Sequence, residues 1–489
     1  MRRALLLALL GATPWAALGD KPAPASPLLP PDHWAVEAAE RLHEVGLAPR
    51  WLPAQRAVPI LVVARTLETA ASEGANPWAS LAHAWVERFH SEFAGAAAPH
   101  AETWQPRVLG AACVGGYEWG TAEPLRGAPP PGPAALHLVA PRPNPFAELR
   151  AAATLGQHLA AGARVHATPW HADLPELEAV GTLGPVALSV GQAPIRYGPN
   201  DLGAIVMSGA ASLERIELMT TSPVRLPGPL HAVGDLALDL AVARFSESRH
   251  PYDPLLWEFQ LLWRPHPRLT LGAIRGVMFG GALWEGIPAS QVPVAMLGIK
   301  NYRENNGYSV SMKMRLPTES LLPLTAKLEW GSDDNPGAAL QWPGVVAGLS
   351  SPMLPGLPAA LGVEYAYFGR GPFGYHDPFG WYAHGQYVGG WATGQAPLGD
   401  PLGGNGRALR VVASADPFDA RARVKAAAWV QDRFADNLYA PAAGGRSVGF
   451  RGEAEVRLGR GAVGARGSYE RGDDGWSRSE LTVGATVFF

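Results

Sequence analysis

A segment with the side chains needed to bind sugars lies between Gly371 and His384, where the sequence reads GPFGYHDPFGWYAH. Aromatic rings can stack on the flat faces of sugar rings, while imidazole and carboxylate groups hydrogen-bond hydroxyls. We therefore predict an external loop that binds polysaccharide through Phe373, Tyr375, His376, Asp377, Trp381 and Tyr382. The same rings, with Phe379, are at least as typical of loop packing or of a membrane-interface girdle, where amphipathic aromatic residues are enriched.

Catalytic and metal-binding motifs are not found in the sequence. It has no Gly-x-Ser-x-Gly elbow, no His-Glu-x-x-His and no Walker loop, and its 14 His are scattered without metal-ligand spacing. Its one cysteine, Cys113, cannot form an internal disulfide. We expect no catalytic residues, metal or cofactor, although barrel enzymes that act on lipid or glycan carry wall-mounted groups without a linear motif.

The N-terminus predicts export. Arg2 and Arg3 precede the apolar run Ala4 to Ala12, and Ala17-Leu18-Gly19 before Asp20 is a small-x-small cleavage pattern. We assign residues 1–19 to a signal peptide and 20–31 to a Pro-rich linker. No segment approaches the roughly 20 consecutive apolar residues of a membrane helix. The net charge of -3 excludes a strongly basic nucleic-acid binder.

Residues 32–98 have the periodicity of a small helical bundle. Trp34, Ala38, Leu42 and Val45 recur at helical spacing, with Asp32 as candidate N-cap. Two further helices are predicted over Val58 to Ser72 and Pro77 to Phe93, the second capped by Asn76 with Pro77 at its first position. We place this bundle in the periplasm.

From about Trp104 to the C-terminus the pattern changes to period two, and we assign residues 99–489 to one domain. In Val310 to Leu316 the even positions are apolar and the odd positions polar, and Leu324 to Trp330 and Ala422 to Val430 divide in the same way. One apolar and one charged face per strand fits a barrel with lipid outside and a polar interior. The fold class is therefore mainly β, a large closed antiparallel transmembrane β-barrel of roughly 18 strands in an outer membrane.

Side-chain direction in these strands assigns two further groups. Aromatic residues near strand ends are expected in the interfacial girdles: Trp263, Trp330, Tyr365, Tyr367, Trp391 and Trp429. Charged or polar residues expected to face the lumen or contact a plug are Arg196, His266, Arg275, Arg315, Lys327, Glu329, Arg421, Arg423 and Lys425. A barrel this wide has a lumen that either conducts or is plugged.

The last strand alternates to its end: Leu481, Val483, Ala485, Val487 and Phe489 share one face. A terminal aromatic residue on such a strand resembles the signal by which bacterial outer-membrane barrels engage their assembly machinery. An unpaired apolar edge would promote aggregation, so we expect the sheet to close.

Three segments carry a resemblance to a known family: GQAPIRYGP from Gly191 to Pro199, VMSGAASLERIELMTTSPVRLPG from Val206 to Gly228, and RPHPRLTLGAIRGVMFGG from Arg264 to Gly281. They resemble the Wzi-type capsule assembly family of outer-membrane proteins. The resemblance implies a surface lectin that helps hold or organise capsular or exported polysaccharide, without catalysis. A porin or substrate-specific channel shares every barrel feature and remains the alternative.

Overall fold

The computed structural model describes most of the chain after the predicted signal peptide. The described residues are 24–73, 77–97, 104–121, 143–245, 252–282, 288, 290–291, 294, 304–333, 339–371, 380–393, 396–439 and 443–489. The predicted signal peptide and the first part of the linker lie outside these ranges.

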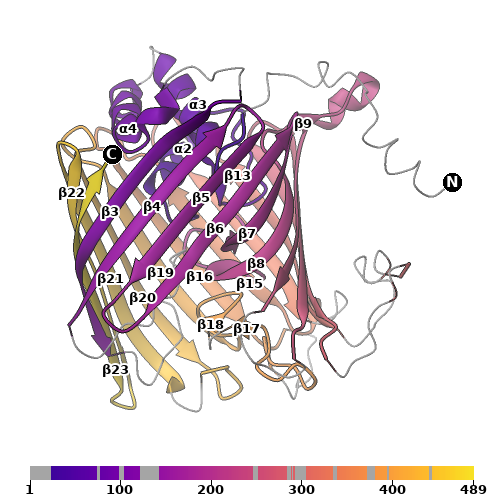
Figure 1. The fold of residues 1–489 in the computed structure, drawn as a ribbon. Helices are drawn as coiled ribbons and strands as arrows, with labels where there is room; N and C mark the ends of the chain where they lie inside the picture. Colours follow the sequence, from indigo (N-terminus) through magenta and orange to yellow (C-terminus); the bar gives the residue numbers. More distant parts are fainter. Residues whose placement is uncertain are drawn as a thin grey trace.

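A closed antiparallel barrel of 18 long strands forms the body of the described molecule (Figure 1). The chain closes on itself because β23 pairs with β3 along most of its length, from Ser479↔Thr121 to Phe488↔Ala112. This pairing leaves the terminal strand without a free edge, and it confirms the predicted fold class. The barrel strands are β3 (Pro106–Thr121), β4 (Asn144–Leu155), β5 (Leu159–Ala167), β6 (Ala172–Leu183), β7 (Val186–Arg196), β8 (Ser208–Thr220), β10 (Asp235–Arg244), β11 (Leu255–His266), β12 (Leu269–Phe279), β13 (Asn305–Arg315), β14 (Thr325–Asp333), β15 (Gly344–Ser351), β16 (Ala359–Phe368), β19 (Gly406–Ala415), β20 (Ala422–Arg433), β21 (Gly445–Leu458), β22 (Gly461–Gly472) and β23 (Ser477–Phe488).

Side chains alternate between the two faces of the wall as the period-two pattern predicts. In β14, Lys327 and Glu329 are buried inside the barrel while Trp330 is exposed on its outer face. In β20, Val424 and Val430 point outward and Arg423 points inward to a helix. Outward apolar and inward charged residues are the arrangement that suits lipid outside and a polar interior.

The predicted aromatic girdle is partly wrong. Trp263, Trp330 and Tyr365 are exposed on the outer face, and Tyr367 has the outward parity of Tyr365 in β16. Trp391 and Trp429 are instead buried inside the barrel, with 1% and 3% of their surface exposed. The Trp429 ring lies against Gly449 of the neighbouring strand β21, where a Cβ would be within 2.4 Å of the indole.

Three helices sit at one end of the barrel: α2 (Trp34–Glu44), α3 (Ile60–Ser72) and α4 (Ala79–Glu92) (Figure 1). Their core contains Leu42, Leu67 and Trp85. The helices match the predicted positions, but each begins later than predicted. His33 rather than Asp32 caps α2, because the His33 Nδ1 accepts from the Ala35 N–H. Pro77 precedes α4 instead of opening it, and Asn76 lies outside the described residues.

Short strands and 3-10 turns complete the described structure. β1 (Leu28–Leu29), in the predicted linker, pairs with β2 (Val58–Pro59), and both are buried. A 3-10 turn, η2 (Ala94–Ala97), follows α4. Another 3-10 turn, η3 (Gly228–Val233), follows the short β9 (Val224–Arg225), and β17 (Ala392–Thr393) pairs with β18 (Ala396–Pro397). Among the described residues no helix has the length and apolar character needed to cross a bilayer.

The two ends of the barrel differ. At the end that carries the helices, successive strands are joined by short turns at residues 156–158, 184–185, 267–268 and 459–460. The other end carries longer connections, among them residues 369–405 between β16 and β19. Short turns at one end and long loops at the other are typical of outer-membrane barrels, in which the short turns face the periplasm.

Candidate functional site

The connection between β7 and β8 folds into the barrel instead of leaving it. Residues 197–207 are mostly buried, and their base is closed by the Tyr197 N–H, which donates to the Met207 carbonyl at 3.0 Å. The loop is held to the wall by Glu364 of β16, whose Oε2 accepts from the backbone N–H groups of Asp201 and Leu202 at 3.2 and 3.1 Å. This segment contains part of the family-like sequence GQAPIRYGP.

A second connection, described over residues 380–393 and 396–405, packs onto the first from the long-loop end. The Trp391 Nε1 donates to the Val206 carbonyl at 2.8 Å, and the Tyr382 hydroxyl donates to the Ile205 carbonyl at 2.6 Å. Trp381 packs edge-on against Phe368, with ring centroids 5.0 Å apart. Together the two inward segments form an apolar layer across the barrel.

A buried ion cluster joins both segments to the wall. Arg410 of β19 contacts Asp400 of the second segment and Glu364 of β16, and all three side chains are buried. Gly203 of the first segment lies directly against this cluster: a Cβ at this position would be 2.2 Å from Asp400 and 2.3 Å from Arg410. A larger residue at this position would push the charged groups of the cluster apart, and breaking a buried ion pair is strongly destabilising. The position therefore favours glycine.

Helix α2 is fastened to the inside of the barrel mouth by a row of glutamates. Glu37, Glu40 and Glu44 recur at helical spacing. Glu37 accepts from Arg423 at 2.6 Å and from Lys425 at 3.0 Å, both on β20. Burial raises the pKa of the Glu37 carboxyl, but these two cations outweigh burial and lower the pKa overall.

The other two glutamates meet lysines on the facing wall. Glu40 contacts Lys313 of β13. Glu44 lies 2.8 Å from Lys313 and 3.2 Å from Lys327 of β14. Lys327 also contacts Asp201 of the first inward segment at 2.8 Å, so a single cation links helix, wall and loop.

The predicted lumen and plug residues divide into two groups. Arg315, Lys327 and Arg423 contact α2, as Lys425 does. Arg196 holds the first inward segment by donating to the carbonyls of Ser208 and Asn200, and Glu329 is buried beside Gly198 of that segment.

Three of the predicted lumen residues do not face the lumen. His266 is the exposed last residue of β11, and Arg421 is exposed in the turn before β20. Arg275 lies over the ring of Tyr308, on the opposite side of β12 from Ile274, which belongs to the interior apolar layer. Polarity alone could not predict that His266 and Arg421 lie at strand ends or that Arg275 lies on the outward side of β12.

The predicted sugar-binding loop is described only in part. Phe373, Tyr375, His376, Asp377 and Phe379 lie outside the described residues. Trp381 and Tyr382 are buried, with 1% and 2% of their surface exposed, and both rings pack inside the barrel. In this arrangement they offer no free ring face to a glycan. The sequence reasoning missed Asp201, Glu364, Asp400 and Arg410, for which no linear motif gives a signal.

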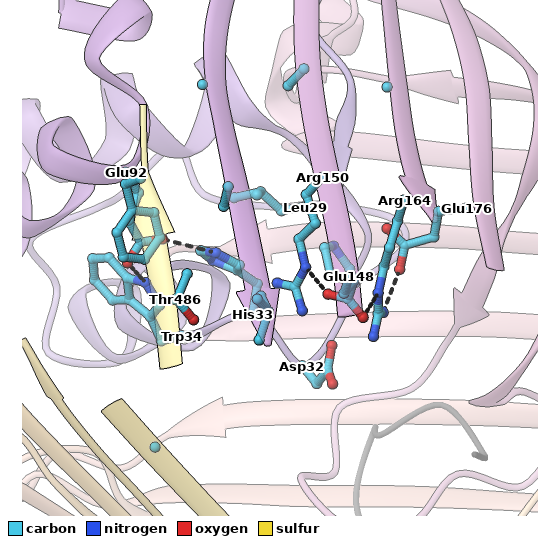
Figure 2. A pocket seen from close by; sticks show the side chains of 18 of the residues that line it. Leu29, Asp32, His33, Trp34, Glu92, Glu148, Arg150, Arg164, Glu176 and Thr486 are labelled. Carbon is cyan, nitrogen blue, oxygen red and sulfur yellow. Dashed lines mark hydrogen bonds and ion pairs between the residues drawn. The ribbon is translucent and has the colours of Figure 1, made fainter. Parts of the chain in front are cut away.

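A chamber of about 420 Å³ lies between the helical end of the molecule and the inner face of the barrel wall (Figure 2). Its walls are the inner faces of β3 to β7 and β20 to β23, and the start of α2 with α4 bounds it at the helical end. Part of the wall consists of glycines. Gly464, Gly484 and Gly116 are register partners across β22, β23 and β3, and the row continues to Phe146 on β4.

Charged groups line the chamber in paired networks. Glu148 on β4 accepts from Arg164 at 2.8 Å and also contacts Arg150, and Arg164 donates to Glu176 on β6 at 3.0 Å (Figure 2). At the helical end, Glu92 of α4 accepts from the indole N–H of Trp34 at 2.8 Å and lies 3.3 Å from His33. Burial raises the pKa of the Glu92 carboxyl, but the hydrogen bond from His33 and the nearby arginines outweigh burial and lower it to about 2.

The chemistry available to this chamber is hydrogen bonding. Among the described residues, no three His, Cys, Asp or Glu side chains are placed to hold a metal ion. The charged groups offer many donors and acceptors at fixed positions, most of them already engaged with one another. The chamber therefore suits recognition of a polar molecule by several simultaneous hydrogen bonds.

The family model described as capsule assembly protein Wzi matches residues 179–475, which is more than half of the chain. The chain belongs to the Wzi capsule assembly family. The match covers both inward segments of this Wzi-family barrel and the ion cluster that joins them. A comparison with curated proteins finds no match.

Among solved structures, the Wzi-family barrel is similar to Wzi of Escherichia coli, an outer-membrane protein involved in group 1 capsule assembly and a carbohydrate-binding β-barrel. The TM-score is 0.72 at 15% identity, covering 94% of this chain and 99% of that chain, and it shows the shared fold. Pseudomonas aeruginosa OccK11 (OpdR) gives a TM-score of 0.47 at 12% identity over 80% and 97% of the two chains. Pseudomonas aeruginosa OpdQ gives 0.45 at 10% identity over 79% and 99%. Scores at this level carry no functional inference.

Proposed function

We propose that this protein is an outer-membrane component of capsule or exopolysaccharide assembly that binds surface polysaccharide and holds it at the cell, without catalysis. Membership of the Wzi family is the observation that carries the proposal. The resemblance in fold to Escherichia coli Wzi, a carbohydrate-binding barrel, supports it.

The filled interior supports an anchoring role over transport. Two inward segments and the helix α2 lie across the described part of the lumen, and each is fixed by buried hydrogen bonds and ion pairs. Barrels of this width conduct only when the lumen is open. A porin, the alternative raised by the sequence, would need these fixed contacts to break.

The orientation and partners follow from the same features. We place the helices in the periplasm, because they share the end with the short turns. The outward apolar faces contact outer-membrane lipid. The alternating strand that ends at Phe489 is the element by which the barrel assembly machinery would recognise the chain.

Comparing cells with and without the protein tests this function. We expect the deletion strain to release polysaccharide into the medium and to retain less on the cell, with total polysaccharide unchanged. Expression of the intact chain restores retention. Equal retention in both strains would refute an anchoring role, whereas a loss of total polysaccharide would point to synthesis or export instead.

A further inference from the structure

The chamber combines charged groups in direct hydrogen bonds with charged groups that interact only at longer range. Glu148, Arg164 and Glu176 satisfy one another, as Figure 2 shows. Asp32 and Arg466 also line the chamber, and their opposite charges interact across it without a direct hydrogen bond between them. Asp32 is exposed, so water reaches this part of the chamber.

A row of polar residues and a row of glycines lie next to each other in the wall of the chamber. Thr482 of β23 is the register partner of Arg466 on one side and of Glu118 on the other, which makes a polar row across β22, β23 and β3. The next inward-facing row is Gly464, Gly484 and Gly116. The Phe146 ring of β4 lies over this row, 3.6 Å from the Cβ position of Gly484, so the glycines make room for an aromatic ring beside the polar row.

The far side of the glycine row is bordered by polar and aromatic groups. The Phe146 ring approaches within 3.0 Å of where a Cβ of Gly116 would be and stacks on His166, with centroids 5.3 Å apart. Glu148 and Thr486 follow along the wall. A molecule lying against the Phe146 ring would therefore meet hydrogen-bonding groups on both of its edges.

We infer that this chamber is a binding site for an uncharged saccharide segment, with Thr482, Arg466 and Asp32 as its hydrogen-bonding groups. The inference rests on the proposed function and assigns it a place and a ligand class. A volume of about 420 Å³ lies in the range of small-molecule sites.

The balance of charge selects an uncharged ligand. The lining contains eight carboxylates, six Lys or Arg side chains and two His, so the carboxylates are in slight excess over the fixed cations. An acidic sugar would face that excess and would compete with Glu148 or Glu176 for Arg164, leaving a displaced carboxylate unpaired in a confined space. A hydroxyl both donates and accepts, so it bridges carboxylate and guanidinium without breaking a pair.

A glycan array tests the ligand class. The purified full chain in detergent is applied to immobilised neutral oligosaccharides and to oligosaccharides that contain uronic acids. We expect binding to at least one neutral group and at least tenfold weaker binding to uronate counterparts of the same linkage. Preferential binding to uronates, or no binding to any neutral glycan, would overturn the inference.

Filling the chamber tests the location. Thr482→Trp places a large ring inside the chamber, whereas Val483→Trp places the same ring on the lipid side of the same strand, where Val483 is exposed. We expect Thr482→Trp to abolish neutral-glycan binding and Val483→Trp to retain it, with both proteins keeping the heat-dependent gel mobility of a folded barrel.

A smaller change covers the case in which Thr482→Trp does not fold. Arg466→Gln removes the guanidinium while leaving every ion pair described for the chamber in place, and we expect at least fivefold weaker neutral-glycan binding. Unchanged binding in either folded variant would overturn the assignment to the chamber. In cells, lost retention on deletion but full retention with Thr482→Trp would refute only the chamber, whereas unaffected retention on deletion would refute the proposed function itself.

Discussion

The Arg41 guanidinium on α2 lies 2.5 Å from the Asp416 carboxylate in the turn between β19 and β20, measured from Nη1 to Oδ2. Both side chains are buried. Arg41 also donates to the Pro352 carbonyl in the neighbouring turn between β15 and β16, and Asp416 is shared with Arg423. A buried pair with these additional partners fixes the helix to two turns of the barrel rim.

Asp416→Asn should loosen the helical bundle. The substitution keeps the shape of the side chain but leaves Arg41 as a buried charge without its counterion, a change that typically costs about 3–5 kcal/mol. We expect protease to cleave α2 or its flanking residues in the variant while the barrel stays intact. The matched control is Asp432→Asn, whose partner Arg407 is well exposed. Exposed pairs contribute about 0–1 kcal/mol, so the control should resist cleavage as the natural protein does. Equal resistance of both variants would show that this pair does not hold the bundle.

Acid should release the same helix in two stages, of which the first depends on His43. Burial, with the nearby charge of Lys313, lowers the pKa of His43 from 6.5 to about 3. Below pH 6.5 the His43 side chain therefore stays neutral in the folded chain, whereas in the unfolded chain it takes up a proton. The contribution of His43 to the free energy of unfolding is fully present above pH 6.5 and declines as the pH falls from 6.5 towards 3.

The second stage comes from the carboxylate of Glu92. Its charge is opposite to that of a protonated histidine, but its contribution to stability is also lost as the pH falls. Burial raises the pKa of Glu92, yet its cationic partners lower it to about 2, so its contribution is present above pH 4.5 and is lost on further acidification. His43→Gln keeps a donor for the Ala48 carbonyl. It should flatten the decline in helix melting temperature between pH 6.5 and 4.5 and leave the lower stage unchanged, as measured by circular dichroism. An unaltered upper stage would assign that decline to other groups.

The sequence predicted the barrel well because its interior and exterior impose opposite demands at every second residue. Val310 and Ser311 in β13 could be assigned to faces from polarity alone, and the structure places them as expected. Trp429 shows where polarity misleads. It shares parity with Arg423 and Lys425, so strict alternation would have placed it inside, but its amphipathic ring favoured the girdle.

The inward segments could not be predicted from the sequence. Trp391 and Tyr382 are residue types that are also common in surface loops. Their burial depends on hydrogen bonds to carbonyls that lie far away in the sequence, from Trp391 to Val206 and from Tyr382 to Ile205. The same holds for the cluster of Arg410, Asp400 and Glu364, since each residue alone is typical of a solvated loop or a polar wall. Contacts of this kind follow from the closed barrel, which brings the two loops into one lumen.

Trp381→Ala distinguishes a structural tryptophan from a sugar-binding one. Because the Trp381 ring is buried against Phe368 and Tyr382, its truncation leaves a cavity that typically costs about 3–5 kcal/mol. We expect a lower unfolding temperature together with any loss of polysaccharide retention. Tyr375→Ala, in the same predicted loop, should reduce retention without a change in stability if that loop binds glycan. A fully stable Trp381→Ala protein that no longer retains polysaccharide would restore Trp381 as a binding residue.

The filled lumen predicts that the natural protein conducts poorly in a planar lipid bilayer. Trp391 and Tyr382 carry the hydrogen bonds that join the two inward segments, so replacing both with Ala removes those bonds and two large rings from the layer that crosses the barrel. We expect the double variant to show larger and more frequent open states than the natural protein. Trp330→Ala is the control, because this ring lies on the outer face and its loss leaves the interior unchanged. A large stable open state in the natural protein would instead support the porin alternative, since ions would then pass the segments held by the contacts of Glu364, Arg410 and Asp400.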